Sequence, residues 1–123
     1  MATSKNRRFL ANWDSQARKG VLVLIVMSAL SKREYYGYEL VEHILTSTGV
    51  EVSDGTLYAI LVRLKAEGLV RTRWEAAERG PARKYYALTA DGRAAFAEMK
   101  RSWTEFASGV DAILHDRSGS DVS

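Results

Sequence analysis

Three features of this chain of 123 residues predict a mainly helical (α+β) fold. Residues 53–68 and residues 89–115 each have the pattern of a helix that starts at a hydroxyl-bearing capping residue. Residues 69–88, between them, have the pattern of two β-strands joined by a turn. This order predicts a winged helix-turn-helix with a two-stranded β-wing, followed by a long C-terminal helix.

Two further helices are expected before residue 53, at about residues 13–30 and 37–48. The first contains the longest apolar run of the chain, residues 21–27. The run is too short to cross a hydrocarbon layer of about 30 Å. About twenty mostly polar residues precede it and no small-residue cleavage site follows, unlike a secretory signal. We therefore expect a core helix and no membrane partner.

The helix predicted at residues 53–68 has an apolar inner face and an outer face of mostly small residues. Ser53 or Asp54 is suited to cap its start, and Gly68 to end it in a left-handed conformation. Spacings of three and four place on the inner face Leu57, Ile60, Leu61 and Leu64. The outer face carries Gly55, Ala59, Val62 and Ala66, flanked by Thr56, Tyr58 and Arg63. This outer face can approach another surface closely.

The hairpin is predicted from alternation and from its turn. In residues 69–75, Val70, Thr72 and Trp74 alternate with Arg71, Arg73 and Glu75, as in a half-buried strand. The turn at residues 78–81 holds the only proline of the chain, Pro81, where no amide donor is needed. Residues 83–88 form the returning strand.

The last helix carries an apolar stripe that predicts self-association. Thr89 is suited to cap it, and Asp91 favours its first turn. Alternating intervals of three and four residues then place on one side Phe96, Met99, Trp103, Phe106, Val110 and Ile113. With Leu114, this seam is the expected dimer interface, about 27 Å long at 1.5 Å per residue. In the alternative, the stripe packs only on its own domain.

These patterns divide the chain into four regions. Residues 13–88 form the DNA-binding winged helix, residues 89–115 the dimerisation helix, and residues 116–123 a flexible tail. Residues 1–12 form an arm with Lys5, Arg7 and Arg8, for which disorder, contact with DNA and continuation of the first helix all remain open.

Charge is unevenly distributed along the chain, whose net value is +3. Residues 1–35 and 53–88 are basic, whereas residues 36–52 and 89–123 are acidic. Local positive potential on the arm and the wing favours a nucleic-acid partner, because phosphate attraction depends on local charge.

Residue composition excludes several kinds of chemistry. The chain has no cysteine, which rules out disulfides and thiolate chemistry and fits a reducing cytoplasm. Its two histidines, His43 and His115, fall in separate predicted helices without a third ligand or a catalytic partner. We therefore expect no enzyme activity, no cofactor and no metal site.

Five short motifs resemble the PadR family of bacterial transcriptional regulators. In chain order they are residues 37–40 (GYEL), 55–58 (GTLY), 63–70 (RL with EGLV), 79–86 (RGP leading into RKYY) and 88–92 (LT with G). The resemblance covers about residues 20–95 and is to the short form with a single C-terminal dimerisation helix. The chain departs from the family pattern at Ala59, where relatives commonly have proline, and in having a longer segment before the first helix. The resemblance implies a homodimeric repressor that binds a palindromic operator and releases it when a small phenolic or planar aromatic ligand binds.

Candidate DNA-binding residues follow from this arrangement. The helix before the wing enters the major groove, and its start favours anions. We assign Ser53, Gly55, Thr56 and Tyr58 to this helix start, with Thr56 and Tyr58 contacting phosphates and Arg63 contacting phosphate or base. On and beside the wing the candidates are Arg79, Arg83 and Lys84. The resemblance places Tyr36 and Tyr38 near the DNA backbone. In the alternatives, Tyr58 is a core aromatic and the wing cations protect a sheet edge.

Trp103 is the candidate effector-binding residue, with Met99, Phe106 and Trp13 beside it. An indole in a dimer seam resembles the platform on which multidrug-sensing relatives stack planar ligands, although a large side chain there also simply fills the seam. The remaining functional alternative is a winged helix that serves protein interaction or ligand sequestration without DNA.

Overall fold

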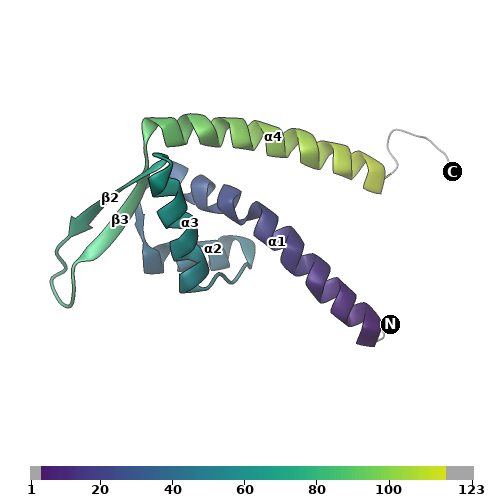
Figure 1. The fold of residues 1–123 in the computed structure, drawn as a ribbon, viewed down its shortest axis with the longest axis horizontal. Coiled ribbons are helices and arrows are strands. Elements are labelled where there is room, and N and C mark those ends of the chain that lie inside the picture. Colours follow the sequence, from purple (N-terminus) through teal and green to yellow (C-terminus); the bar gives the residue numbers. More distant parts are fainter. Residues whose placement is uncertain (1–3, 116–123) are drawn as a thin grey trace.

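The computed structural model describes residues 4–115, with side chains from Asn6 onward, so the predicted flexible tail at residues 116–123 lies outside it. In chain order the elements are α1 (Ser4–Lys32), β1 (Tyr35–Tyr36), α2 (Gly37–Thr48), α3 (Asp54–Ala66), β2 (Val70–Glu75), β3 (Arg83–Leu88) and α4 (Ala90–Leu114) (Figure 1). The fold is therefore mainly helical with one small antiparallel sheet, as expected. None of the helices described is apolar over the length that a membrane crossing requires.

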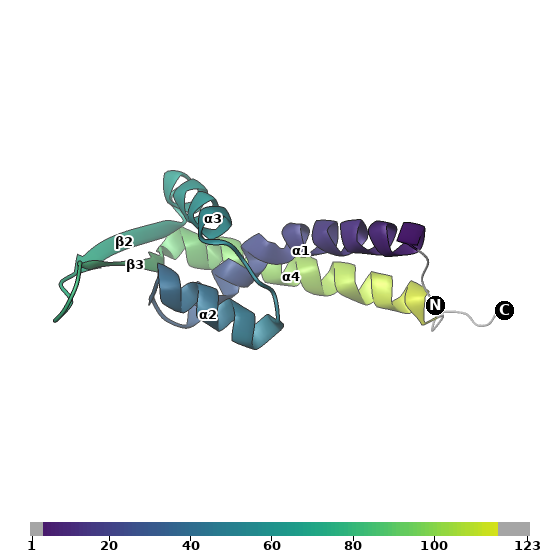
Figure 2. The same ribbon diagram turned by 90° about the horizontal axis from the view of Figure 1, so that it is seen from below.

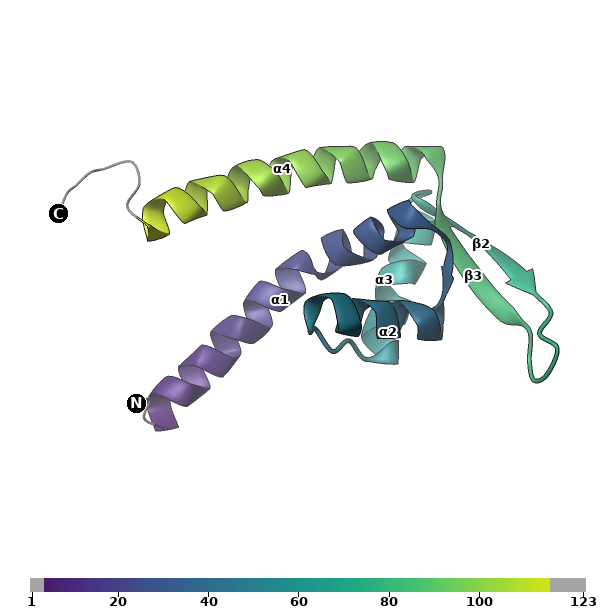
Figure 3. The same ribbon diagram turned by 180° about the vertical axis from the view of Figure 1, so that it is seen from behind.

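Helix α1 starts at Ser4, before the start expected near residue 13, so the described part of the arm continues the first helix, which was one of the three alternatives left open for it. Its C-terminal half enters the core through Val26, Met27 and Leu30. Its N-terminal half extends away from the winged helix, and α4 runs toward the same end of the molecule (Figure 2). From behind, the wing projects on one side while α1 and α4 diverge toward their free ends on the other (Figure 3).

Capping residues fix where α3 and α4 begin. The Ser53 hydroxyl accepts a hydrogen bond from the Thr56 amide at 3.1 Å, and the Thr89 hydroxyl accepts one from the Gly92 amide at 3.0 Å. Both capped starts agree with the sequence pattern. Helix α3 ends before Gly68, whose φ of 76° is the left-handed conformation expected there.

The core lies where α1, α2 and α3 meet the sheet. Its fully buried side chains come from all of these elements and include Met27, Leu30, Leu40, Ile44, Leu61 and Leu88. The first turns of α4 close one side, through the half-buried Ala95, Phe96 and Met99. This packing holds the outer face of α3 away from the core.

The sheet contains one short strand in addition to the two strands of the predicted wing. The sheet order is β1-β3-β2, with Tyr35 opposite Tyr86 and Tyr36 opposite Tyr85. Strand β1 has only two residues, too few for an alternating pattern, and it forms because β3 offers a free edge. The predicted two-stranded wing is therefore present, and a short third strand that was not predicted joins it at its root.

Candidate nucleic-acid interface

The outer face of α3 is open to solvent. Thr56, Tyr58, Ala59 and Val62 are all exposed along it. The Ser53 hydroxyl is 2.9 Å from the Thr56 hydroxyl, so these two groups hold each other at the helix start. Ser53 therefore caps the helix, and its contribution to an interface is to fix the first turn and its amides.

Arg63 lies farther along α3 and is paired within the helix. Its Nε donates to the Glu67 carboxylate at 3.3 Å, and both side chains are exposed. Exposed pairs at this spacing contribute only about 0.3–0.5 kcal/mol. The guanidinium is therefore easily redirected to a stronger anion such as a phosphate.

Tyr38 and Tyr58 flank a cavity of about 480 Å³ between α2, α3 and β3. Both helix starts contribute to it, through Gly37 of α2 and Gly55 of α3. Tyr86 forms part of the wall, and burial, followed by its neighbour Tyr58, raises the pKa of its phenol. The cavity thus brings two helix starts, two exposed phenols and the Asp54 carboxylate to one edge.

Tyr36 lies on the other face of the sheet from Tyr86. Its ring packs edge-on against Tyr85, with 5.5 Å between centroids, and the Arg83 guanidinium lies 4.6 Å from its centroid. The structure therefore separates the residues assigned to DNA into two groups. Tyr38 and Tyr58 lie together, whereas Tyr36 and Arg83 pair on the opposite face.

Arg73 of β2 is fixed by contacts that the sequence did not indicate. Its guanidinium forms an ion pair with the Glu34 carboxylate, to which its Nε also donates a hydrogen bond at 2.9 Å. Its Nη1 donates a hydrogen bond to the Glu75 carboxylate at 2.6 Å. The hydrogen bond from Arg73 is the main cause that lowers the pKa of the Glu34 carboxyl. Glu34 precedes β1, so this pair ties the end of α1 to the wing.

The other wing cations differ in the side chains that they contact. The Lys84 ammonium lies 5.7 Å from the Trp74 ring centroid and 5.8 Å from that of Tyr86. Arg79, in the turn, is exposed and shows no ion pair with any residue of the described chain. Of the wing cations assigned to DNA, Arg79 and Lys84 thus form no ion pair with a carboxylate and do not stack on the far face, while Arg71 of β2 donates to the Leu88 carbonyl at 2.9 Å.

The apolar stripe of α4 is divided between two environments. Phe96 and Met99 pack against the core, as expected if this part of the stripe packs on its own domain. Farther along, Phe106, Ile113 and Leu114 are 66%, 83% and 71% exposed, and Trp103 and Val110 are also exposed. Within residues 4–115, the second half of the stripe is therefore exposed to solvent.

Trp103 lies between two cavities. One, of about 290 Å³, is bounded by α1 and α2 and includes Lys32 and His43 in its wall. The other, of about 480 Å³, lies between α1 and α4 and includes Met99 and Phe106. Trp13 lines neither cavity, and its side chain is 60% exposed.

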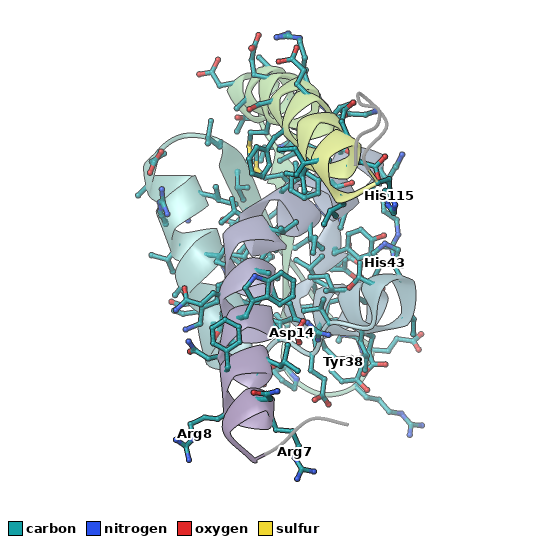
Figure 4. All side chains as sticks on the ribbon, turned by 90° about the vertical axis from the view of Figure 1, so that its right-hand side faces the viewer. Arg7, Arg8, Asp14, Tyr38, His43 and His115 are labelled. Atoms are coloured by element: carbon teal, nitrogen blue, oxygen red, sulfur yellow. The ribbon has the colours of Figure 1, made fainter. Side chains whose placement is uncertain are left out.

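Side chains suited to catalysis are scattered in the described part of the chain. His43 packs on the Tyr35 ring at 5.1 Å between centroids, and His115 contacts Asp111 at 3.1 Å one turn earlier in α4 (Figure 4). Residues 4–115 contain no cluster of three metal-ligating side chains.

A family model described as the transcriptional regulator PadR-like family matches residues 26–98, the span from α1 to the first turns of α4. The chain belongs to this family. Members of the PadR family are transcriptional regulators rather than enzymes, and the family carries DNA binding with it.

Solved PadR structures share the fold over most of the chain. A PadR family regulator from Eggerthella lenta is 29% identical with a TM-score of 0.82, and the match covers 91% of this chain and 97% of that one. A PadR-like regulator from Bacillus cereus is 35% identical with a TM-score of 0.73, covering 80% and 96%. A curated transcriptional regulator of Mycobacterium tuberculosis is 34% identical over 90 residues, 73% of this chain and 82% of its own. The sequence resemblance and the winged-helix fold are both confirmed.

Proposed function

We propose that the chain is a homodimeric repressor that binds a palindromic operator through α3 and the wing. The observation that carries this proposal is the open outer face of α3, with Tyr58 near its start, Tyr38 beside it at the start of α2, and wing cations that form no ion pair. A helix start supplies free amides to a phosphate, and exposed side chains farther along can reach base edges. The proposed site of action is the bacterial cytoplasm, where operator DNA lies.

The dimer is proposed from two uncovered apolar surfaces in one chain. The second half of the α4 stripe is one, and Phe9, Leu10 and Trp13 on the projecting part of α1 are the other. Apolar area in water is unfavourable by about 25 cal/mol per Å², so covering both surfaces with a second copy is favourable. A two-fold axis would place each α1 against the partner's α4 and present two copies of α3 on one side.

The proposed effector is a small planar aromatic or phenolic compound that stacks on Trp103. The cavities on both sides of this indole support the proposal, because a flat ligand entering either one would meet the ring face. Met99 and Phe106 belong to the same wall, whereas Trp13 would take part only if it came from the partner's α1. Binding there would alter the angle between α1 and α4 and so the spacing of the two α3 helices.

A mobility-shift titration tests the DNA-binding proposal. The probe is the duplex immediately upstream of the coding sequence, compared with a scrambled duplex of the same length. We expect tighter binding to the upstream duplex and a steep loss of affinity as salt rises. Absence of binding to any duplex at low salt would contradict the proposal and would favour a winged helix that serves protein or ligand binding alone.

A further inference from the structure

Trp74 is exposed on the wing although it occupies an inward position of the strand pattern. Its side chain is 66% exposed, and it stands directly opposite Lys84 in the β2–β3 register. An exposed tryptophan is unusual because its large apolar ring gains most from burial.

The register shows which way this face of the wing points. Trp74 shares its face with Val70 of the same strand and with Tyr86 of β3, both of which are buried. Tyr86 in turn lines the cavity formed with Leu57 and Tyr58 of α3. The face that packs on α3 at the root of the wing is therefore the face that carries Trp74 and Lys84 near its end.

A cation lies beside the Trp74 ring. The Lys84 ammonium lies 5.7 Å from its ring centroid, and the uncommitted Arg79 follows in the turn. The neighbouring carboxylate of Glu75 is already engaged by Arg73. The indole thus has the Lys84 ammonium beside it and the Arg79 guanidinium in the following turn, which also contains the Glu78 carboxylate.

We propose that Trp74 is a DNA-contacting residue whose indole lies against the sugars of the groove wall next to the groove that α3 enters. This inference rests on the proposed function. Lys84, held beside the ring, meets the adjacent phosphate. Contact with sugars carries no base information, so Trp74 contributes affinity on every duplex rather than sequence preference.

Fluorine NMR of the 5-fluorotryptophan-labelled chain tests the contact directly. The chain has three tryptophans, and the Trp74 resonance is identified by its loss in Trp74→Phe. On addition of the upstream duplex at low salt, we expect the Trp74 resonance to move and its solvent-isotope shift to fall. An unmoved Trp74 resonance, under conditions where a mobility shift shows the duplex bound, would overturn the proposal.

Two further outcomes of the NMR experiment would point to another explanation for the exposed indole or against DNA binding itself. If dilution of the free chain moves the Trp74 resonance, a second copy covers the indole, and the proposal is overturned in favour of contact between wings. If the unaltered chain binds no duplex at low salt, the proposed function and this inference both fail, and none of the three resonances moves with DNA.

Affinity measurements supply the matching energetic test. Trp74→Ala is expected to weaken binding about tenfold on the upstream and the scrambled duplex alike, because the apolar area that the indole buries against the sugars is lost. Trp74→Phe, which keeps an aromatic ring, should lose less affinity than Trp74→Ala. Because Trp74 is exposed, circular dichroism of Trp74→Ala should match the unaltered chain. An unchanged affinity in the folded Trp74→Ala variant would overturn the proposal.

Discussion

The backbone of Gly92 in α4 lies directly against the carbonyl oxygen of Leu69 at the root of the wing. A Cβ added to Gly92 would overlap that oxygen and lie 3.3 Å from Cδ2 of Leu88. The Thr89 hydroxyl also donates to the Gly68 carbonyl at 2.7 Å. The first turn of α4 is therefore fixed to the base of the hairpin, which connects the proposed dimer helix to the proposed DNA-binding wing.

Gly92→Ala is expected to destabilise the fold by about 1–3 kcal/mol, because the methyl group forces α4 away from β2. Urea unfolding followed by circular dichroism measures this change. Gly109→Ala is the matched control, since it lies in the same helix with open space around its Cα. The control should unfold at the same or slightly higher urea concentration. Equal midpoints for both variants would contradict the close approach.

Glu34→Gln is expected to lower stability at neutral pH by removing the charge that holds Arg73. Folding lowers the pKa of the Glu34 carboxyl below its ordinary 4.5, so its contribution is complete above that value and is lost as pH falls through the folded-state pKa. The difference in melting temperature between the two proteins should be largest near pH 7 and should disappear as the pH falls through the folded-state pKa of Glu34. A difference that persists in acid would point to a cause other than charge.

Ile113→Asp combined with Leu114→Asp is expected to shift the chain toward monomer, because each buried charge would oppose association by several kcal/mol. Sedimentation velocity at micromolar concentration measures the mass. Ser108→Asp, on the opposite side of α4, is the control and should leave the mass unchanged. A dimer that survives the double substitution would place the interface elsewhere.

Lys84→Ala is expected to weaken binding to every duplex and to reduce the slope of log affinity against log salt by about one. Lys100→Ala removes an exposed lysine on α4 and is the control, with an unchanged slope expected. An equal change in both variants would indicate general charge rather than a wing contact.

Trp103→Ala is expected to abolish the response to a flat aromatic compound that lowers operator affinity in the unaltered chain. Tryptophan fluorescence quenching and a mobility shift with the same compound measure binding and release. A release that survives Trp103→Ala unchanged would place the effector in another cavity.

Local signals in the sequence account for much of the fold. The bounds of α2 and the capped starts of α3 and α4 followed from residues next to one another in the chain, such as Ser53 with Thr56. Contacts between residues far apart in the sequence did not follow from such local signals. The two residues of β1 become a strand only beside β3, and the Arg73–Glu34 pair joins positions 39 residues apart. Neither has a periodic pattern that would predict it.

The sequence suggested candidate site residues but not their geometry. Residue types and spacing suggested Tyr58 and Lys84, and the family resemblance suggested Tyr38, whereas the structure shows that Lys84 and Arg83 lie on opposite faces of the wing. Arg7 and Arg8 of the predicted arm lie at the free end of α1 and point away from the domain (Figure 4). Their contact with DNA stays a prediction, as does the function of every assigned site residue.

The mass of the complex on one upstream duplex tests the central claim most directly. Light scattering coupled to gel filtration should give one duplex with two chains, because a two-fold dimer presents two α3 helices to successive major grooves on one side of the DNA. A complex with a single chain per duplex, from a protein that is monomeric at micromolar concentration, would contradict the account.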